Sequence, residues 1–153
     1  MLNLFRKKAA NFFTAEEKEI ITAGIKAAEL NTSGEVRVFV ESRCKFVQAV
    51  DRAEEIFGQL KMYQTEQRNA VLIYVALKDR QLAVFGDKGI HEKVGTAFWN
   101  EEVKHMIQFF NKENYAEGIA TIAINIGNAL AANFPYNKST DVNELSDEIV
   151  FGS

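Results

Sequence analysis

The residues best suited to chemistry in this chain are two acids, an amide, a hydroxyl and a guanidinium in three separate segments. Glu35 follows a Ser-Gly pair, Thr65, Arg68 and Asn69 precede an apolar run, and Asp87 stands between two glycines. Calcium takes about six to eight oxygen ligands of these kinds, whereas magnesium takes fewer protein ligands and more water. Arg68 would orient a carboxylate or bind an anion such as phosphate beside the metal. If these segments meet, they form an oxygen-rich cation site.

The elements predicted around these residues bring two of the segments to one edge of a sheet. Residues 35–41 alternate, with three valines on one side, and residues 69–77 are apolar almost without a break. Both patterns predict strands. A helix predicted over 46–60 has a core stripe of Phe46, Val50, Ala53, Phe57 and Leu60. A strand, a helix and a strand in this order form a crossover unit, so the two strands should run parallel and begin at the same edge.

A predicted hairpin returns the chain to that edge. The turn is Lys78-Asp79-Arg80, and the strand after it runs back antiparallel to the apolar strand. With this turn, we expect Ala83 to pair with Val75 and Asp87 to arrive near Val71. The third segment of the candidate site therefore joins the other two.

The remainder of the chain is predicted to be helical. Thr14 begins the first helix, with Glu17 three residues later as in a capping box, and later helices are expected over 90–94, 99–110 and 115–134. We predict one α/β domain, a three-layer α/β/α sandwich around a small mixed β-sheet. The domain spans residues 1–135, with its core at 14–135. Residues 136–153 form an acidic C-terminal tail, partly docked through its apolar residues.

Composition excludes several classes of protein. The 18 Lys and Arg residues against 21 Asp and Glu give a net charge of -3, which argues against a nucleic-acid partner. The single cysteine, Cys44, excludes an internal disulfide framework. The N-terminus lacks the apolar run of a secretory signal, and asparagines interrupt the most apolar helix, over 118–134. We expect a soluble, cytoplasmic protein with no membrane span.

Other candidate sites give weaker signals. The opposite sheet edge should gather a rim of charged side chains, which are Glu41, Arg43, Lys45, Lys78, Asp79 and Arg80. No glycine-rich phosphate loop follows the first strand, so a solvated rim is the better interpretation. His91 and His105 do not share a metal-ligand spacing, and no motif specifies an enzyme. At the first site the plain alternatives are an ordinary Gly-Asp-Lys-Gly turn and an ion pair between Glu35 and Arg68.

An ordered set of short motifs resembles the TPM domain family. The set consists of Ser33-Gly34-Glu35, Thr65, Arg68-Asn69-Ala70-Val71-Leu72-Ile73, Gly86-Asp87-Lys88-Gly89-Ile90, Trp99, Tyr115-Ala116-Glu117-Gly118-Ile119, Phe134-Pro135 and Asn143-Glu144-Leu145. The resemblance covers roughly residues 14 to 150 and implies an α/β/α fold. The family includes a thylakoid-lumen protein of photosystem II repair, credited with acid phosphatase activity and calcium binding, and animal membrane proteins that modulate acetylcholine receptors. It also includes many bacterial proteins.

The resemblance places Glu35 and Asp87 on the family's acidic site motifs, with Arg68 and Asn69 beside them. We therefore expect a bacterial, cytoplasmic protein that binds a divalent cation, calcium or alternatively magnesium, through Glu35, Asp87 and Asn69. Thr65 and Arg68 would support the ligands or bind an anion. A structural or partner-binding role is expected, with an unidentified protein partner. The alternatives are a metal-dependent acid phosphatase acting on phosphate monoesters, and an interaction module that uses the basic residues of the rim or the acidic tail.

Overall fold

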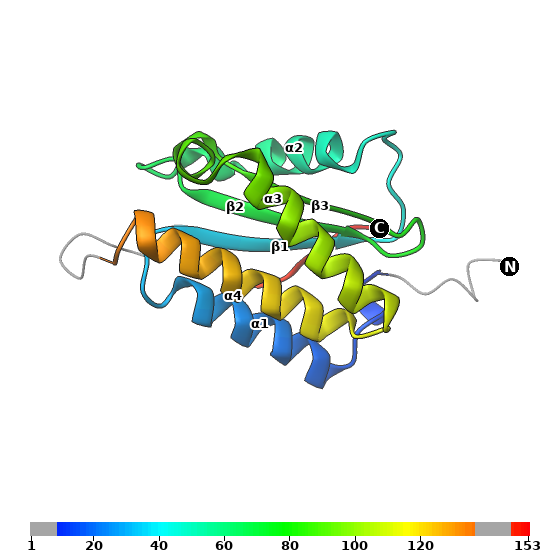
Figure 1. The fold of residues 1–153 in the computed structure, drawn as a ribbon. Coiled ribbons are helices and arrows are strands. Elements are labelled where there is room, and N and C mark those ends of the chain that lie inside the picture. The colour runs from blue at the N-terminus through cyan, green and yellow to red at the C-terminus, as the bar shows by residue number, and fades with distance from the viewer. Residues whose placement is uncertain (1–8, 137–147) are drawn as a thin grey trace, which may run out of the picture.

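The computed structural model describes residues 9–136 and 148–153. Helices cover both faces of a four-stranded mixed sheet, as predicted (Figure 1). The main elements in chain order are α1 (Ala15–Glu29), β1 (Glu35–Glu41), α2 (Ala49–Gln59), β2 (Ala70–Ala76), β3 (Gln81–Gly86), α3 (Lys88–Asn111), α4 (Tyr115–Asn133) and β4 (Val150–Phe151). Residues 137–147 of the predicted acidic tail, which include the Asn143-Glu144-Leu145 motif, lie outside the described residues.

The strand order is β3-β2-β1-β4. β1 and β2 run parallel, with Glu35 opposite Ala70 and Glu41 opposite Ala76, and β3 runs antiparallel to β2. Both orientations confirm the sequence prediction. The sequence did not predict β4, whose two residues pair in parallel with Phe39 and Val40 of β1.

The predicted register of the hairpin is wrong by one residue. Ala83 pairs with Tyr74 rather than Val75, and Val71 pairs with Gly86, so Asp87 follows one position later. The reason is that the turn spans residues 77–80, with Arg80 in a left-handed conformation at φ 51°. The turn therefore has four residues instead of three, and a shift of one residue exchanges the faces of every side chain in a strand.

Two separate hydrophobic cores lie on the two faces of the sheet. The valines of β1 and the odd-numbered residues of β2 pack against α1, α3 and α4, whereas the even-numbered residues of β2 pack against α2. α1 and α4 approach closely because glycines lie at their contact. A methyl group at Gly24 would come within 2.8 Å of Ala120 Cα, and one at Gly127 would overlap Ala28.

The start and the buried stripe of α2 differ from the prediction. The helix begins at Ala49, after Gln48 in an extended conformation, and it buries Ala49, Ala53, Ile56 and Phe57. Phe46 and Val50, predicted in the core, are 37% and 45% exposed. The stripe that begins at Ala49 has the same helical spacing of four and three residues as the predicted one. The sequence pattern therefore fits either set of residues as the buried face.

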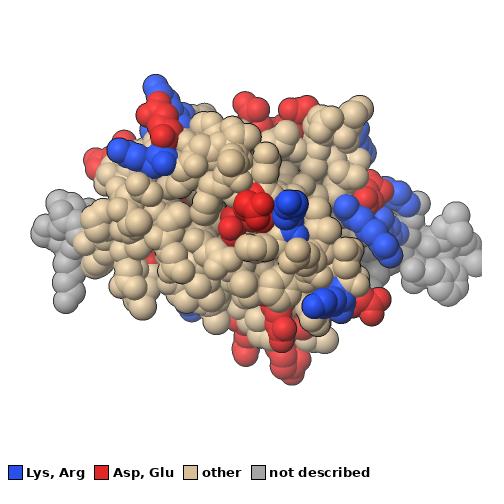
Figure 2. All heavy atoms as spheres, in the orientation of Figure 1, with Lys and Arg blue, Asp and Glu red and all other residues tan. Residues whose placement is uncertain are grey.

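α3 contains one interruption and slants past the sheet near β3 (Figure 1). Gly95 has φ 78°, a left-handed conformation that glycine adopts without steric cost, and it separates two helical segments. This break matches the gap predicted between Val94 and Trp99. The face of the molecule shown in Figure 2 is mostly uncharged. Acidic and basic side chains adjoin near its centre, and most of the other charged side chains lie toward its margins. Among the described residues no helix is long and apolar enough to cross a membrane.

Candidate functional site

Asp87 begins α3 and forms a two-point ion pair with Arg68. Arg68 Nε donates to Asp87 Oδ2 at 2.7 Å and Nη2 donates to Oδ1 at 2.8 Å, while Lys88 N also donates to Oδ1 at 2.7 Å. The Asp87 side chain is 5% exposed and that of Arg68 is 47% exposed. The hydrogen bonds and negative charge of Asp87 raise the pKa of Arg68. Asp87 is therefore both an N-terminal cap and a charge-paired acid.

The two glycines around Asp87 have separate steric reasons. A methyl group at Gly86 would overlap the ring of Trp99, and one at Gly89 would overlap the backbone oxygen of Gln67. Gly89 N donates to Arg68 O at 2.8 Å, which joins the start of α3 to the loop before β2. Close packing, rather than flexibility, therefore explains the glycines of this motif.

Asn69 lies at the start of β2 and is 1% exposed. Its backbone N–H donates to Thr65 Oγ1 at 3.2 Å, and its side-chain Nδ2 donates to Ser33 Oγ at 3.2 Å. Its Oδ1 is buried and has no hydrogen-bond partner within residues 9–136 and 148–153. A buried acceptor without a partner costs about 1–3 kcal/mol, so an oxygen in this position is suited to a ligand.

Glu35 lies at the same edge, on the other side of β2 from Asp87. Its amide donates to Asn69 O at 3.3 Å, and Asp87 N donates to Ala70 O at 2.9 Å. Glu35 is 3% exposed and shares with its partner Ala70 the face covered by α2. Because one strand separates them, the backbones of Glu35 and Asp87 lie roughly 10 Å apart.

The structure thus brings all five predicted residues to one sheet edge, in two hydrogen-bonded groups. Arg68 contacts Asp87, and Thr65 contacts Asn69. The described residues include no group of three His, Cys, Asp or Glu that could hold a metal. A cation here would need amide, hydroxyl or backbone oxygens as well as carboxylates, which is a donor set for hard cations.

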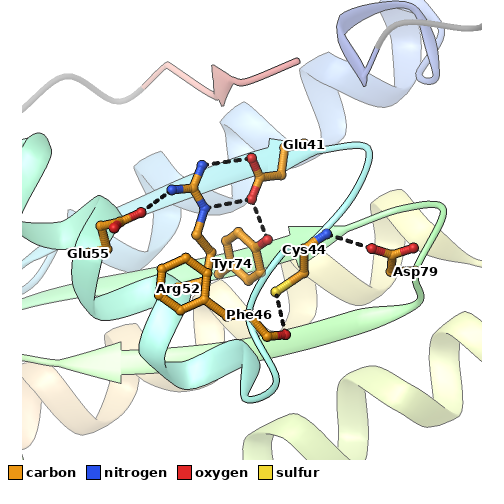
Figure 3. Close-up of polar contacts among 7 residues, drawn as sticks. All are labelled: Glu41, Cys44, Phe46, Arg52, Glu55, Tyr74 and Asp79. Carbon is orange, nitrogen blue, oxygen red and sulfur yellow. Dashed lines mark hydrogen bonds and ion pairs between the residues drawn. The ribbon is translucent and has the colours of Figure 1, made fainter.

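The opposite edge holds a buried polar cluster that the sequence analysis missed (Figure 3). Glu41, predicted on a solvated rim, is 6% exposed. Arg52 of α2 donates from Nε and Nη2 to its two carboxylate oxygens, both at 2.9 Å, and the Tyr74 hydroxyl donates to Oε2. Burial, followed by the hydrogen bond to Glu41, raises the pKa of Tyr74. Tyr74 could have revealed this cluster from the sequence, because it is a residue with a polar hydroxyl in an otherwise apolar strand. The alternation of side chains puts it on the same face of the sheet as Glu41.

Asp79 closes the loops beside this cluster. It accepts from Arg43 Nη1 at 3.0 Å. It also accepts from Cys44 N at 2.7 Å (Figure 3). The Cys44 thiol donates to Phe46 O at 3.6 Å. Each of these acids already has its own donors, so this edge is better explained by structural bonding than by a ligand site.

Comparison with known proteins identifies the family. A scan against protein-family models matches the TPM domain over residues 7–129. The chain belongs to the TPM domain family. A search of curated proteins gives no match.

Three solved structures are similar to the chain. The BA42 protein of the psychrophilic bacterium Bizionia argentinensis is 40% identical, over 92% of this chain and 96% of that one, with a TM-score of 0.84. The N-terminal domain of a P. gingivalis protein is 17% identical, over 82% and 80% of the two chains, with a TM-score of 0.64. The N-terminal domain of the Corynebacterium glutamicum cg2496 protein is 14% identical, over 88% and 84%, with a TM-score of 0.60. The last two support the fold alone.

Proposed function

We propose that this TPM domain binds a divalent cation, calcium in preference to magnesium, at the edge where β1 and β2 begin. Asn69, Glu35 and Asp87 would be the ligands, with Thr65 and Arg68 supporting them. The role would be non-catalytic, with the cation fixing the loops at this edge for a structural or partner-binding task. The proposal rests above all on Asn69 Oδ1, a fully buried acceptor without a hydrogen-bond partner in the described part of the chain.

The ion pair between Arg68 and Asp87 determines how a cation would enter. A cation that binds Asp87 must replace the guanidinium, and Arg68 is half-exposed, so its side chain can move into solvent at little cost. Arg68 and the cation would therefore compete for one carboxylate. In this arrangement Arg68 keeps the acid neutralised while the cation is absent.

A calcium titration followed by melting temperature and by backbone NMR tests the proposal. We expect shifts at Glu35, Asn69 and Asp87, and a stabilisation of about 2.7 kcal/mol when calcium is at 100 times its Kd. A parallel magnesium titration should give weaker binding. If the amides of these three residues do not move in saturating calcium, the proposal is wrong.

Two variants move the affinity in opposite directions. Asn69→Ala removes the buried oxygen and should weaken calcium binding by at least tenfold. Arg68→Gln removes the competitor for Asp87 and should strengthen it. Glu101→Gln, on the exposed surface of α3, is the matched control and should leave the affinity unchanged. If Arg68→Gln has no effect, Asp87 is not a ligand.

A metal-dependent phosphatase is the alternative, favoured by the half-exposed guanidinium of Arg68 beside Asp87. The guanidinium would stabilise charge on a transferring phosphoryl group, and the cation would polarise its oxygen. Hydrolysis of p-nitrophenyl phosphate in the presence of calcium or magnesium tests this function. Activity that persists in Asp87→Ala would come from a contaminant.

A further inference from the structure

Within residues 9–136 and 148–153, no strand pairs with the outer edge of β3, so backbone groups there are unpaired. β3 is at the end of the sheet in the described structure, and Asp87 N bonds to Ala70 O of β2. In an antiparallel ladder the backbone groups of alternate residues face the partner strand. Residues 81, 83 and 85 therefore face β2, and Leu82, Val84 and Gly86 direct their N–H and C=O groups away from it.

This edge lacks the usual protection against pairing. Edge strands of native proteins commonly carry lysine, proline or a bulge, because an open edge invites another strand. The sequence of β3, Gln-Leu-Ala-Val-Phe-Gly, contains no charged residue and no proline. Its surroundings protect it from pairing with another sheet instead, because β3 lies in a groove of about 800 Å³.

The groove has two walls and an apolar floor. The start of α2, at residues 48–50, forms one wall, and a stripe of α3 from Lys88 to Val103 forms the other. Trp99 lies against Gly86 and donates its indole N–H to His91 Nδ1 at 2.9 Å, so the wall at that end is held in place. The groove therefore follows the whole length of β3 between two helices.

We propose that this groove binds an extended, uncharged segment of a partner protein, which adds to the sheet as a strand beside β3. Its backbone would pair with Leu82, Val84 and Gly86, and its alternate apolar side chains would contact Val50, Trp99 and Val103. The charged lining residues, Asp87, Lys88 and Glu92, all belong to α3 and lie near the Gly86 end, and Asp87 is neutralised by Arg68. A charged segment would meet no opposite charge along residues 81–85.

The position of β3 also argues against a second copy of this chain as the occupant. Two copies would have to bring their β3 strands to about 4.8 Å, the spacing of paired strands. Because each strand lies between α2 and α3, the helices of the two copies would collide before the strands met. A small molecule suits a cavity of this size but would leave the row of backbone groups unpaired.

The probe is a peptide selected from a displayed random library on the full chain and then synthesised with blocked ends. We expect NMR shifts and slower amide exchange at Leu82, Val84 and Gly86. Val50→Lys, which puts a charge into the wall at an exposed position, should weaken binding by at least tenfold. Val47→Lys is the matched control, because Val47 is 94% exposed and does not line the groove.

A chemical control separates strand addition from binding through side chains alone. The same peptide, N-methylated at the alternate amides that would face β3, keeps its side chains but cannot pair, and it should bind at least tenfold more weakly. Equal binding of the two peptides would overturn the proposal. So would selection of no peptide that discriminates Val50→Lys, shifts confined to other surfaces, or a dimer in sedimentation with β3 protected. Asp87 lines the groove and is also a proposed calcium ligand, so the peptide is titrated once in EDTA and once in calcium. Binding in EDTA tests the groove whatever the outcome of the calcium titration.

Discussion

A polar atom that is buried without a partner marks a place where this fold accepts a cost. Three such atoms occur among the described residues, Arg37 Nε, Asn69 Oδ1 and Glu102 Oε1. Asn69 lies at the edge where we propose that a cation binds, and an unbonded acceptor there would serve as a ligand. Glu102 is different, because it lies on α3 at the packed side of the helix and is 6% exposed. Burial raises its pKa, against the opposing effects of a hydrogen bond to Asn125 and the nearby His105.

The variant Glu102→Gln should stabilise the protein at neutral pH by on the order of 1 kcal/mol, because it removes a charge from a buried site. The pKa of Glu102 is higher in the folded than in the unfolded chain, so the folded state binds protons more readily. The cost of the carboxylate is therefore present above the folded pKa and disappears as the pH falls through it toward the ordinary value of 4.5. Urea unfolding at a series of pH values measures this difference between the two proteins.

The control for this measurement is Glu101→Gln, one residue away. Glu101 is 60% exposed, and its Oε1 forms a long surface ion pair with Lys104 Nζ at 3.7 Å. Its replacement should therefore change the free energy of unfolding by less than about 0.5 kcal/mol at any pH. Parallel pH profiles for Glu102→Gln and the parent would contradict the account given for Glu102.

Replacements of Asp87 should separate its two structural tasks. Asp87→Asn keeps a capping oxygen for α3 but loses the charge opposite Arg68, whereas Asp87→Ala loses both. We expect Asp87→Ala to lower the free energy of unfolding by about 1–2 kcal/mol and Asp87→Asn by less. Urea unfolding measures both. Equal losses would show that the ion pair, and not the cap, accounts for the effect.

At the scale of elements, a local sequence pattern predicted a strand or helix where its position depends on that segment alone. The bounds of β1 followed from its alternation. β2 lies within the predicted apolar run 69–77 and is one residue shorter at each end. The hairpin register did not follow, because the turn takes four residues, 77–80, where the sequence predicted three. The predicted buried face of α2 was wrong for a related reason. Ala49 and Val50 are both apolar, and only the packed sheet selects between them.

The contact between β3 and α3 gives a prediction at this scale. Gly86→Ala should lower the free energy of unfolding by about 1–3 kcal/mol, because the added methyl group must displace the Trp99 ring. Trp99 fluorescence should change in the folded variant, since Trp99 is the only tryptophan. Gly58→Ala in α2 is the control. No atom lies near its Cβ position, so it should stabilise the helix by about 0.5–1 kcal/mol. If Gly86→Ala is neutral, the close approach is not a constraint.

At the scale of the whole molecule, the sequence predicted which segments meet but not how their side chains bond. Parallel strands begin at one edge, so Glu35 and Asn69 were placed correctly from topology. The sequence placed Asp87 beside Arg68, but the ion pair that it named as the plain alternative was between Glu35 and Arg68, whereas the structure pairs Arg68 with Asp87. The cluster of Glu41, Arg52 and Tyr74 was hidden because each residue belongs to a different element. β4 has two residues, too few to carry a period.

The C-terminal strand gives the last prediction. β4 covers the outer edge of β1, where Gly152 N donates to Val40 O at 2.8 Å and Ser42 N donates to Ser153 O at 2.8 Å. Deletion of residues 149–153 removes these bonds and exposes Phe39. We expect the free energy of unfolding to fall by about 1–3 kcal/mol. We also expect association at high concentration, because β1 becomes an open edge.

Urea unfolding and sedimentation measure the two effects of this deletion. Phe151→Leu is the control, because it keeps the strand and most of the apolar side chain, and it should stay within about 1.5 kcal/mol of the parent and remain unassociated. An unchanged unfolding midpoint for the deletion would show that two paired residues add nothing to the sheet. A destabilised but monomeric deletion would show that β4 contributes packing without protecting the edge. That result would also matter for β3, because it would mean that an open edge in this fold does not by itself recruit a strand, and that any partner must be selected by the walls of the groove.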